Sequence, residues 1–441
     1  MGFLDAASAA PDLRTSEQKP ADATRAVEAV ESREQGDGPA ASDTASLKMD
    51  VSAFTRDHDG SKFPISGDLD ERTLYDLLVW TADKGASDVT IETGFPVKAD
   101  FSGTWCAITD RVMTDRDLRR AIGYAYGGEH GIGKLEAGDD LDPPLETFVR
   151  KDGRRRYRVN ITACRVPGGR GYQMTFRTLP SVPPTLVELG IEKEIVDNTR
   201  PGAGMIVVCG PTGSGKSTLL AATIRHLIER GASEKILEYS SPIEYVYDGL
   251  AGESTIVTQT EVGQHLRPPR YMEDMSPFAY AVRNALRRKP SIILIGEARD
   301  RETIEGCIEA SLTGHLLYTT LHSTGVGECL PRMVKPFPGG MREQAAADIM
   351  TSMRMVVSQK LLPGAEGGRV ACREFMVFDQ RIRNKYMDTH IDDWPSLTRK
   401  TLQDSSTTGR TFVESAYLLL EAGKISPQTY KTIASAQRGA A

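Results

Sequence analysis

The sequence lacks both paired cysteines and long apolar runs. Its six cysteines are scattered without any C-x-x-C pair, which is expected of a reduced compartment and excludes a disulfide framework or a zinc site. No run approaches the roughly 18 apolar residues that a bilayer-spanning helix needs. The start, MGFLDAASAAPDLR, has an early acidic residue and no apolar core, so no secretory signal is expected. Any membrane role is therefore expected to act through partners.

The sequence also has little net charge outside one segment. The 441-residue chain has a formal charge of −6, and residues 1–66 carry 12 acidic and 7 basic side chains. The remainder is nearly neutral, which disfavours bulk binding to nucleic acid. Residues 1–66 are rich in Ala, Ser, Asp, Glu and Pro and poor in aromatic residues, so we predict that they form a disordered acidic tail.

Beyond the tail, the patterns predict an α/β protein. A helix around residues 74–82 and strands at SDVTIE, RRYRVNITACRV and GYQMTFRTL predict a small domain over residues 67–180. The three prolines of LPSVPPTL predict a stiff linker over residues 181–190. The apolar runs MIVVCG, EKILEYS, SIILIGE and HLLYTTLH, separated by helical segments, predict a buried parallel sheet over residues 191–380. Residues 381–441 are expected to be a C-terminal helical region.

The segment GPTGSGKST fits the phosphate-loop pattern G-x-x-x-x-G-K-[ST]. An apolar strand enters it and an amphipathic helix leaves it, so backbone N–H groups can converge on phosphate oxygens at a helix N-terminus. Lys216 can neutralise charge on the β- and γ-phosphates, and Ser217 can bind Mg²⁺. A structural turn with an idle lysine is strongly disfavoured. We predict a nucleotide site formed by Gly210, Pro211, Thr212, Gly213, Ser214, Gly215, Lys216, Ser217 and Thr218.

Two further patterns follow along the chain. SIILIGEARD ends an apolar strand in Glu297, as a Walker B strand ends in an acid beside magnesium, and downstream of a phosphate loop this predicts a metal or water role. GHLLYTTLHSTG places His315 and His322 seven positions apart on one strand and its exit. A single histidine on an apolar stretch is usually a hydrogen-bonded core residue, and that alternative stays open. Metal binding by the two histidines is disfavoured because no third ligand has suitable spacing.

Taken together, the motifs resemble those of the secretion-superfamily traffic ATPases. GPTGSGKST, SSPIEYVYD, GEARDRETI and TGHLLYTTLHS occur in the order and rough spacing of that family, which includes the PilT motility motor, type II secretion ATPases, and the DotB and TraJ ATPases. The resemblance covers roughly residues 70–380, and GEARD and SPIEYVYD look closest to the DotB/TraJ branch. It implies a RecA-like P-loop ATPase core that uses ATP and Mg²⁺, a smaller PAS-like N-terminal domain and a ring of six subunits.

The same resemblance implies roles for individual residues. Glu244 matches the glutamate of the family's Asp box and Glu297 that of Walker B. Both are candidates for water activation and Mg²⁺ coordination, and residue type does not divide the two tasks between them. A surface acid after a proline turn is the alternative for Glu244. His315 and His322 match the His box, which implies contact with the nucleotide phosphates or with a neighbouring subunit.

Arginines of the N-terminal domain complete the implied site. Arg158 in RYRVN and Arg177 in FRTLP match family arginines that reach the phosphates, where a guanidinium stabilises transition-state charge. A solvated strand face is the alternative for both. Nucleic-acid binding is disfavoured because few aromatic residues alternate with the arginines. Five more arginines lie nearby, namely Arg154, Arg155, Arg156, Arg165 and Arg170.

The chain departs from the family pattern at one place. Ser240 and Ser241 stand where relatives commonly have an acidic residue before the proline. Glu238 is expected on the opposite phase of the strand, where it would be no substitute.

The leading hypothesis is a cytoplasmic homohexameric ATPase, recruited peripherally to the inner membrane, that hydrolyses ATP to ADP and phosphate. It would power a type IV (type IVB-like) secretion, conjugation or pilus apparatus, with inner-membrane platform proteins and a companion ATPase as partners. The first alternative is a RecA-like DNA translocase, which the nearly neutral body disfavours. The second is a non-hydrolysing nucleotide-binding scaffold, for which Ser240 and Ser241 give slight support.

Overall fold

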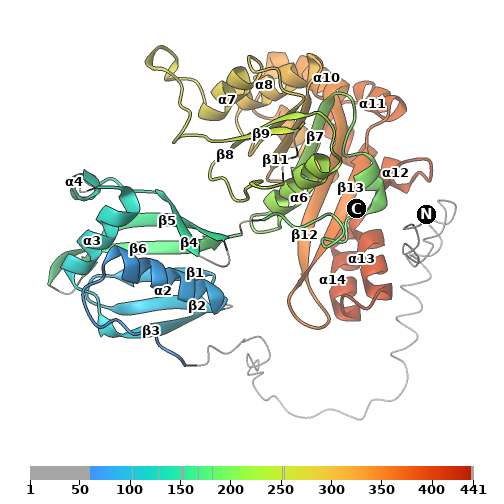
Figure 1. Cartoon of the computed structure of the whole chain (residues 1–441). Helices are drawn as coiled ribbons and strands as arrows, with labels where there is room; N and C mark the ends of the chain where they lie inside the picture. Colours follow the sequence, from blue (N-terminus) through green and yellow to red (C-terminus); the bar gives the residue numbers. More distant parts are fainter. Residues whose placement is uncertain are drawn as a thin grey trace, which may run out of the picture. The chain divides into compact units, whose positions relative to one another are not determined.

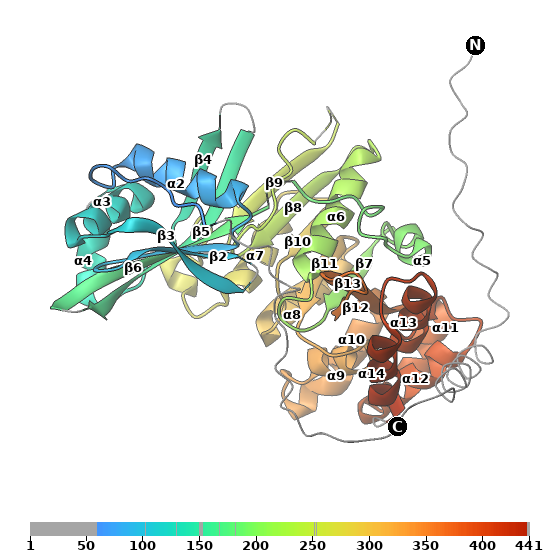
Figure 2. The same cartoon turned by 90° about the horizontal axis from the view of Figure 1, so that it is seen from below.

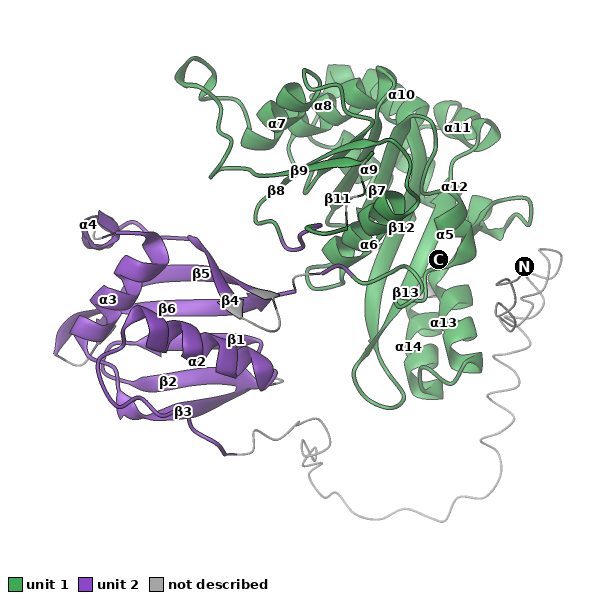
Figure 3. Ribbon diagram, viewed as in Figure 1, with its two compact units in different colours: residues 1–41, 184–243, 248–441 green, residues 42–183, 244–247 purple. Residues whose placement is uncertain are grey.

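The structure of the chain is a computed structural model. It describes residues 60–438 apart from 102, 129, 150–152, 167, 181, 251 and 253. Most of the predicted acidic tail, residues 1–59, therefore lies outside the described residues. The described chain divides into two compact units (Figure 3). The N-terminal unit runs to Pro183 and also contains Glu244–Tyr247, and the C-terminal unit contains 184–243 and the chain from Asp248 onward.

In its described residues, the N-terminal unit is one antiparallel sheet with three helices (Figure 1). The strand order is β3-β2-β1-β6-β5-β4. Alternate residues of β5, including Tyr157, Val159 and Ile161, share a buried core with Leu74 and Leu77 of α2, as the period of two in a strand requires. The elements are α2 (Glu71–Asp83), β1 (Asp88–Glu92), β2 (Pro96–Phe101), β3 (Thr104–Val112), α3 (Asp115–Tyr126), α4 (His130–Ala137), β4 (Pro144–Val149), β5 (Gly153–Val166) and β6 (Gly169–Leu179).

A buried carboxylate fixes the start of helix α3. Asp117 forms a capping box with Thr114, and its side chain also accepts hydrogen bonds from the backbone N–H of Leu69 at 2.9 Å and from Arg111 Nη2 at 2.8 Å. Burial alone would raise the pKa of Asp117, but the hydrogen bonds from Thr114, Leu69 and Arg111 outweigh it and hold that pKa below its usual value. The carboxylate therefore stabilises the fold in its charged form.

Replacement of this carboxylate is expected to destabilise the N-terminal unit. Asp117→Asn removes the charge opposite Arg111 and should cost about 2–3 kcal/mol, seen as a lower melting temperature in a thermal unfolding scan. Because the folded-state pKa is depressed, the stabilisation is present above the unfolded pKa and is lost as pH falls through the folded pKa. The matched control is Asp115→Asn, in the same helical turn but half exposed. Equal losses in the two variants would contradict this account.

The C-terminal unit is built on an eight-stranded sheet of order β14-β13-β12-β7-β11-β10-β8-β9. The six strands from β12 to β9 are parallel, and β13 and β14 are antiparallel. This confirms the predicted parallel sheet and adds a strand hairpin at one end. The strands are β7 (Gly204–Cys209), β8 (Lys235–Ser240), β9 (Ile256–Glu261), β10 (Ile292–Ile295), β11 (Leu316–Leu321), β12 (Met353–Pro363), β13 (Arg369–Val377) and β14 (Gly409–Arg410).

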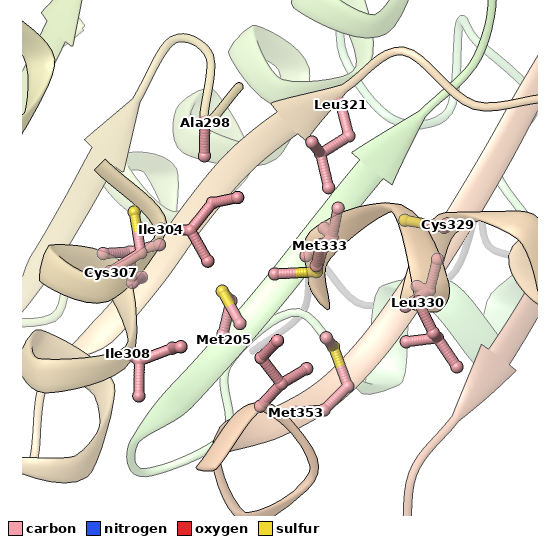
Figure 4. Close-up of a cluster of buried hydrophobic side chains, with 14 of the residues drawn as sticks. Met205, Ala298, Ile304, Cys307, Ile308, Leu321, Cys329, Leu330, Met333 and Met353 are labelled. Atoms are coloured by element: carbon pink, nitrogen blue, oxygen red, sulfur yellow. The ribbon is translucent and has the colours of Figure 1, made fainter. Parts of the chain in front are cut away.

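Helices cover both faces of this sheet (Figures 1 and 2). Odd-numbered residues of β7, such as Met205, pack against Ile304 of α8 and Met333 of α9 in one large apolar core (Figure 4). Helix α6 lies on the opposite face. The two-sided burial explains why these strands read as continuous apolar runs. The helices are α5 (Lys193–Asp197), α6 (Lys216–Glu229), α7 (Pro277–Ala285), α8 (Arg301–Leu312), α9 (Val326–Val334) and α10 (Arg342–Ser352), with the 3-10 turns Arg270–Met272 and Gly339–Met341.

Four helices occupy the end of the chain, where a helical region is expected. They are α11 (Gln380–Met387), α12 (Trp394–Gln403), α13 (Phe412–Glu421) and α14 (Pro427–Arg438), with a 3-10 turn at Ile391–Asp393. Helix α13 packs on β13 through a small apolar cluster that includes Phe412 and Cys372. Across the described part of the chain, none of the helices has both the length and the apolar character needed to cross a bilayer.

Candidate nucleotide site

The predicted phosphate loop lies between strand β7 and helix α6. β7 ends at Cys209 and α6 begins at Lys216, with Gly215 as its N-cap in the left-handed region at a φ of 82°. Gly213 also has a positive φ, 75°, which a side chain would strain. The loop backbone therefore curls over the first turn of α6, and the N–H groups at a helix N-terminus favour an anion. This is the local structure that the sequence pattern predicts.

Lys216 is folded back over this loop. Its ammonium donates to the backbone oxygens of Gly210 and Pro211, both at 3.0 Å. The positive charge thus lies at the mouth of the loop, next to Pro211 and Thr212, which are exposed. An ammonium in this position can exchange carbonyl partners for phosphate oxygens with a small movement of the side chain.

Glu297 and His322 lie together at the carboxyl edge of the same sheet. Glu297 follows β10 and His322 follows β11, and these strands are parallel neighbours. His322 Nε2 is 3.6 Å from Glu297 Oε1. The Thr320 hydroxyl donates to the Gly296 oxygen at 2.6 Å and the Ala298 N–H to the Thr320 oxygen at 3.1 Å, which fixes the backbone on both sides of the carboxylate. β11 also pairs with β7, the strand that enters the phosphate loop.

The structure does not bring His315 to the phosphate loop. His315 precedes β11, and in the β7–β11 register its neighbour Leu316 pairs with Gly204, whereas Leu321 pairs with Cys209. Six strand residues separate the two histidines, about 20 Å at the usual rise. His315 Nδ1 lies 3.1 Å from the Ala310 oxygen at the end of α8, which is the ordinary role left open for a histidine here. Its implied contact with a neighbouring subunit stays a prediction.

Arg158 and Arg177 are brought together in the N-terminal unit. They are directly opposite residues of the antiparallel strands β5 and β6, and both are exposed. Arg177 Nε donates to Asp88 at 2.8 Å, whereas Arg158 has no ion-pair partner within the described residues. Like charges directly opposite on two strands are destabilising. An anion bound between the two guanidinium groups would remove that repulsion.

Comparison with known proteins identifies the family. The family model described as type II/IV secretion system protein matches residues 158–366. The type IV pilus retractation ATPase PilT of Pseudomonas aeruginosa is 34% identical over 316 residues, which are 70% of this chain and 84% of that protein. The chain belongs to the type II/IV secretion ATPase family. A twitching motility protein of Neisseria gonorrhoeae is also similar, at 37% identity over 62% of this chain and 68% of that protein.

Solved structures of secretion ATPases share the fold. The ATPase DotB of Legionella pneumophila superposes with a TM-score of 0.73 at 38% identity, covering 85% of this chain and 98% of that chain. The pilus retraction motor PilT with bound ADP superposes with a TM-score of 0.68 at 29% identity, covering 81% and 95%. These matches confirm the predicted α/β ATPase fold and the resemblance to this family.

In this family member, the Asp-box region differs from the sequence prediction. Glu238 and Ser240 share one face of β8, because Leu237 and Tyr239 point into the core on the other face. The Ser240 hydroxyl donates to Glu238 Oε1 at 2.7 Å. The predicted opposite phase of Glu238 is therefore wrong with respect to Ser240. A buried carboxylate lies beside the first of the two serines.

Glu244 follows this strand in the segment Glu244–Tyr247, which belongs to the N-terminal unit. Its backbone oxygen accepts a hydrogen bond from Arg156 Nη1 at 3.0 Å. Arg156 is itself nearly buried and also pairs with Glu146 at 3.3 Å. The structure thus ties Glu244 to the arginine-bearing strand β5, while Glu297 stays with the phosphate loop's sheet.

The phosphate loop of this family member fits a Mg²⁺-nucleotide by its own geometry. The Ser214 hydroxyl is buried without a hydrogen-bond partner among the described residues, and the loop side of Gly213 is open, since a Cβ there would meet nothing within 4 Å. No cluster of three or more His, Cys, Asp or Glu side chains suited to a metal occurs in the described residues. Ser217 and Glu297 would hold a magnesium ion together with phosphate and water, an arrangement that needs no such cluster.

Proposed function

We propose that the chain is a P-loop ATPase that hydrolyses ATP to ADP and phosphate. The observation that carries the proposal is the pairing of Glu297 with His322 at the edge of the sheet where the phosphate loop lies. Membership of a family of secretion and pilus ATPases supports it. The carboxylate that Glu238 places beside Ser240 removes much of the support for a non-hydrolysing scaffold.

The proposed chemistry follows from the positions of these groups. The phosphate loop and Lys216 hold the β- and γ-phosphates and take up charge as the γ-phosphoryl group leaves. When bound, Mg²⁺ supplies further charge neutralisation at the phosphates, with Ser217 and Glu297 as its protein ligands. Glu297 or Glu244 orients the attacking water. His322 donates a hydrogen bond to the γ-phosphate and so responds to its presence.

We further propose that six copies form a ring that powers a membrane-embedded apparatus. Arg158 and Arg177 would supply positive charge to the nucleotide from the N-terminal unit, so that closure of the site accompanies binding. Among the solved structures, the higher identity and TM-score of DotB, 38% and 0.73 against 29% and 0.68 for the pilus retraction motor PilT, support a type IVB-like secretion or conjugation apparatus. The proposed partners are inner-membrane platform proteins and a companion ATPase, with the protein itself in the cytoplasm and bound peripherally to the membrane.

A phosphate-release assay on the purified full chain tests the proposed function. We expect turnover with MgATP that EDTA abolishes and that double-stranded or single-stranded DNA does not stimulate. Light scattering coupled to size exclusion, with and without a non-hydrolysable ATP analogue, measures the assembly. Strong stimulation by DNA would favour the translocase, and nucleotide binding without turnover in the assembled state would favour the scaffold.

A first variant isolates the role of His322. His322→Ala should lower kcat by roughly 10- to 100-fold, the size expected when a hydrogen bond to a charged group in the transition state is lost. The dissociation constant of a fluorescent ATP analogue should change little, because the phosphate loop is intact. His315→Ala serves as the comparison, since His315 lies at the opposite end of β11. Unchanged turnover in His322→Ala would refute the assignment.

A further inference from the structure

Two buried polar side chains outside all the predicted site residues lie behind the phosphate loop, and one of them contacts it. Gln359 on β12 and Arg373 on β13 are 3% and 2% exposed. Strand β12 pairs with β7 so that Ser358 lies opposite Cys209, and Gln359 is therefore level with the first residue of the loop. Polar groups are rarely buried at this depth without a specific partner.

The contacts between Gln359 and the loop are close and directional. Its side-chain Nε2 donates to the Ser214 backbone oxygen at 2.6 Å. A Cβ on Gly215 would lie 2.9 Å from the same Nε2, and a Cβ on Gly210 would collide with the backbone oxygen of Gln359. Both ends of the loop thus rest on one residue. The orientation of the peptide that follows Ser214 sets the direction of the Gly215 N–H, one of the donors a bound phosphate needs.

Arg373 in turn fixes Gln359. Its Nε donates to Gln359 Oε1 at 2.7 Å, which defines which way the amide faces and leaves the NH₂ group to the loop. The remaining guanidinium donors reach Glu192 Oε2 at 3.2 Å, the Gly190 oxygen at 3.5 Å and the Leu189 oxygen at 3.3 Å. An arginine fork that satisfies several acceptors at once is a rigid support.

We infer that Gln359 and Arg373 are positioning residues for nucleotide binding, forming a relay from Glu192 to the Ser214 carbonyl of the phosphate loop. The inference rests on the proposed ATPase function and deepens it. Neither side chain touches the reacting atoms, so the relay acts by holding the loop in its phosphate-binding form. Leu189–Glu192 follows soon after the point where the chain enters the C-terminal unit, so the relay joins that point to the loop.

The test uses a substitution that removes the hydrogen bond from Gln359 to Ser214 and keeps the one from Arg373 to Gln359. Gln359→Glu preserves an oxygen acceptor for Arg373 but has no N–H for Ser214, and Gln359→Met removes both bonds at similar volume. We expect the KM for ATP and the dissociation constant of a fluorescent ATP analogue to rise about tenfold in Gln359→Glu. We expect kcat to change less than about threefold, because the loop binds ground state and transition state alike. The matched control is Arg369→Met, an exposed position on β13.

The Glu192 end of the relay has its own measurement. Glu192→Ala should raise KM in the same direction by a smaller factor, since Arg373 keeps its carbonyl partners. The double variant Gln359→Glu/Glu192→Ala should show less than the sum of the two single effects, because both act through one arginine. Full additivity would remove Glu192 from the relay.

The outcomes separate this inference from the proposed function. If the unaltered chain releases no phosphate, the ATPase proposal is refuted. The affinity of the variants for the fluorescent ATP analogue still tests the relay in that case. If folded Gln359→Glu keeps the wild-type KM for ATP and the wild-type affinity for the analogue, the inferred relay is overturned. A lower melting temperature with unchanged KM would show a purely structural role and overturn it as well. Should Gln359→Met fail to fold, Gln359→Glu and Arg373→Lys decide, because both keep a polar side chain in place.

Discussion

Lys216→Ala is expected to abolish ATP hydrolysis, with a loss of roughly 100-fold or more in kcat/KM. The reason is that Lys216 supplies the ammonium at the mouth of the loop, folded over the Gly210 and Pro211 carbonyls, and no other lysine of the loop can replace it. Nucleotide affinity should also fall, because the ammonium contacts both ground-state and transition-state phosphates. Phosphate release and binding of a fluorescent ATP analogue measure the two effects separately.

The matched control for this prediction is Lys193→Ala, an exposed lysine at the start of α5 that pairs with Asp197. It removes the same charge from the same unit and should leave turnover within about twofold. If Lys216→Ala kept substantial hydrolysis while remaining folded, the loop would not be the phosphate site, and the ATPase proposal would lose its basis.

Glu297→Gln is expected to lower kcat by about 100- to 1,000-fold while the KM for ATP stays within about threefold. The carboxylate is needed to orient water or hold magnesium in the transition state, and the amide keeps its size without its charge. Such a split is the signature of an interaction made mainly in the transition state. Single-turnover phosphate release with an excess of enzyme over ATP is the decisive measurement, because it is independent of product release.

The control for Glu297 is Glu309→Gln on the exposed side of α8, which should behave as the unaltered chain. Glu244→Gln provides the informative comparison. If Glu244→Gln lowers turnover as strongly and Glu297→Gln mainly raises the Mg²⁺ requirement, then Glu244 orients the water and Glu297 binds the metal. Wild-type turnover in both variants would exclude both carboxylates from the reaction.

Local signals were enough to predict much of this protein. The apolar runs that become β7, β8, β10 and β11 are buried on both faces. A strand buried in this way consists almost entirely of apolar residues, so it can be recognised from the sequence. The phosphate loop is equally local, because its strand, glycines and helix are contiguous in the chain. The proximity of Glu297 and His322 is consistent with the predicted parallel sheet, since the carboxyl ends of neighbouring parallel strands meet at one edge.

Other features depend on contacts that sequence spacing does not encode. His315 precedes β11 and His322 follows it, so the length of the strand separates the two side chains. Their presence in one sequence motif therefore does not place them in one site. The phase assigned to Glu238 was wrong for Ser240 because the two residues are two positions apart within β8, which runs to Ser240, and residues two apart in a strand share one face. Glu244 leaves the sheet altogether and joins the other unit.

Gln359 and Arg373 were not among the predicted site residues, because their contacts are also distant in the sequence. They are 145 and 159 positions beyond Ser214 in the chain. Only the pairing of β12 with β7 and of β13 with β12 brings them near the loop. Their signal in the sequence was the presence of polar residues inside the apolar stretches MRMVVSQKLL and RVACREFMV. A buried strand rarely contains glutamine or arginine without a partner, so such exceptions point to a polar network even where its target is unknown.

The crowding behind the phosphate loop restricts how its sequence can vary. At Gly210 a larger residue would collide with the backbone of Gln359 and would have to displace a buried strand, and at Gly215 it would press on the Gln359 side chain from a backbone with a positive φ. Pro211 and Thr212 face solvent and are free of that constraint. Substitutions that adjust how fast the nucleotide is exchanged, whether by natural drift or by engineering, are therefore confined to the outer tip of the loop, where a side chain can change without moving the sheet beneath it.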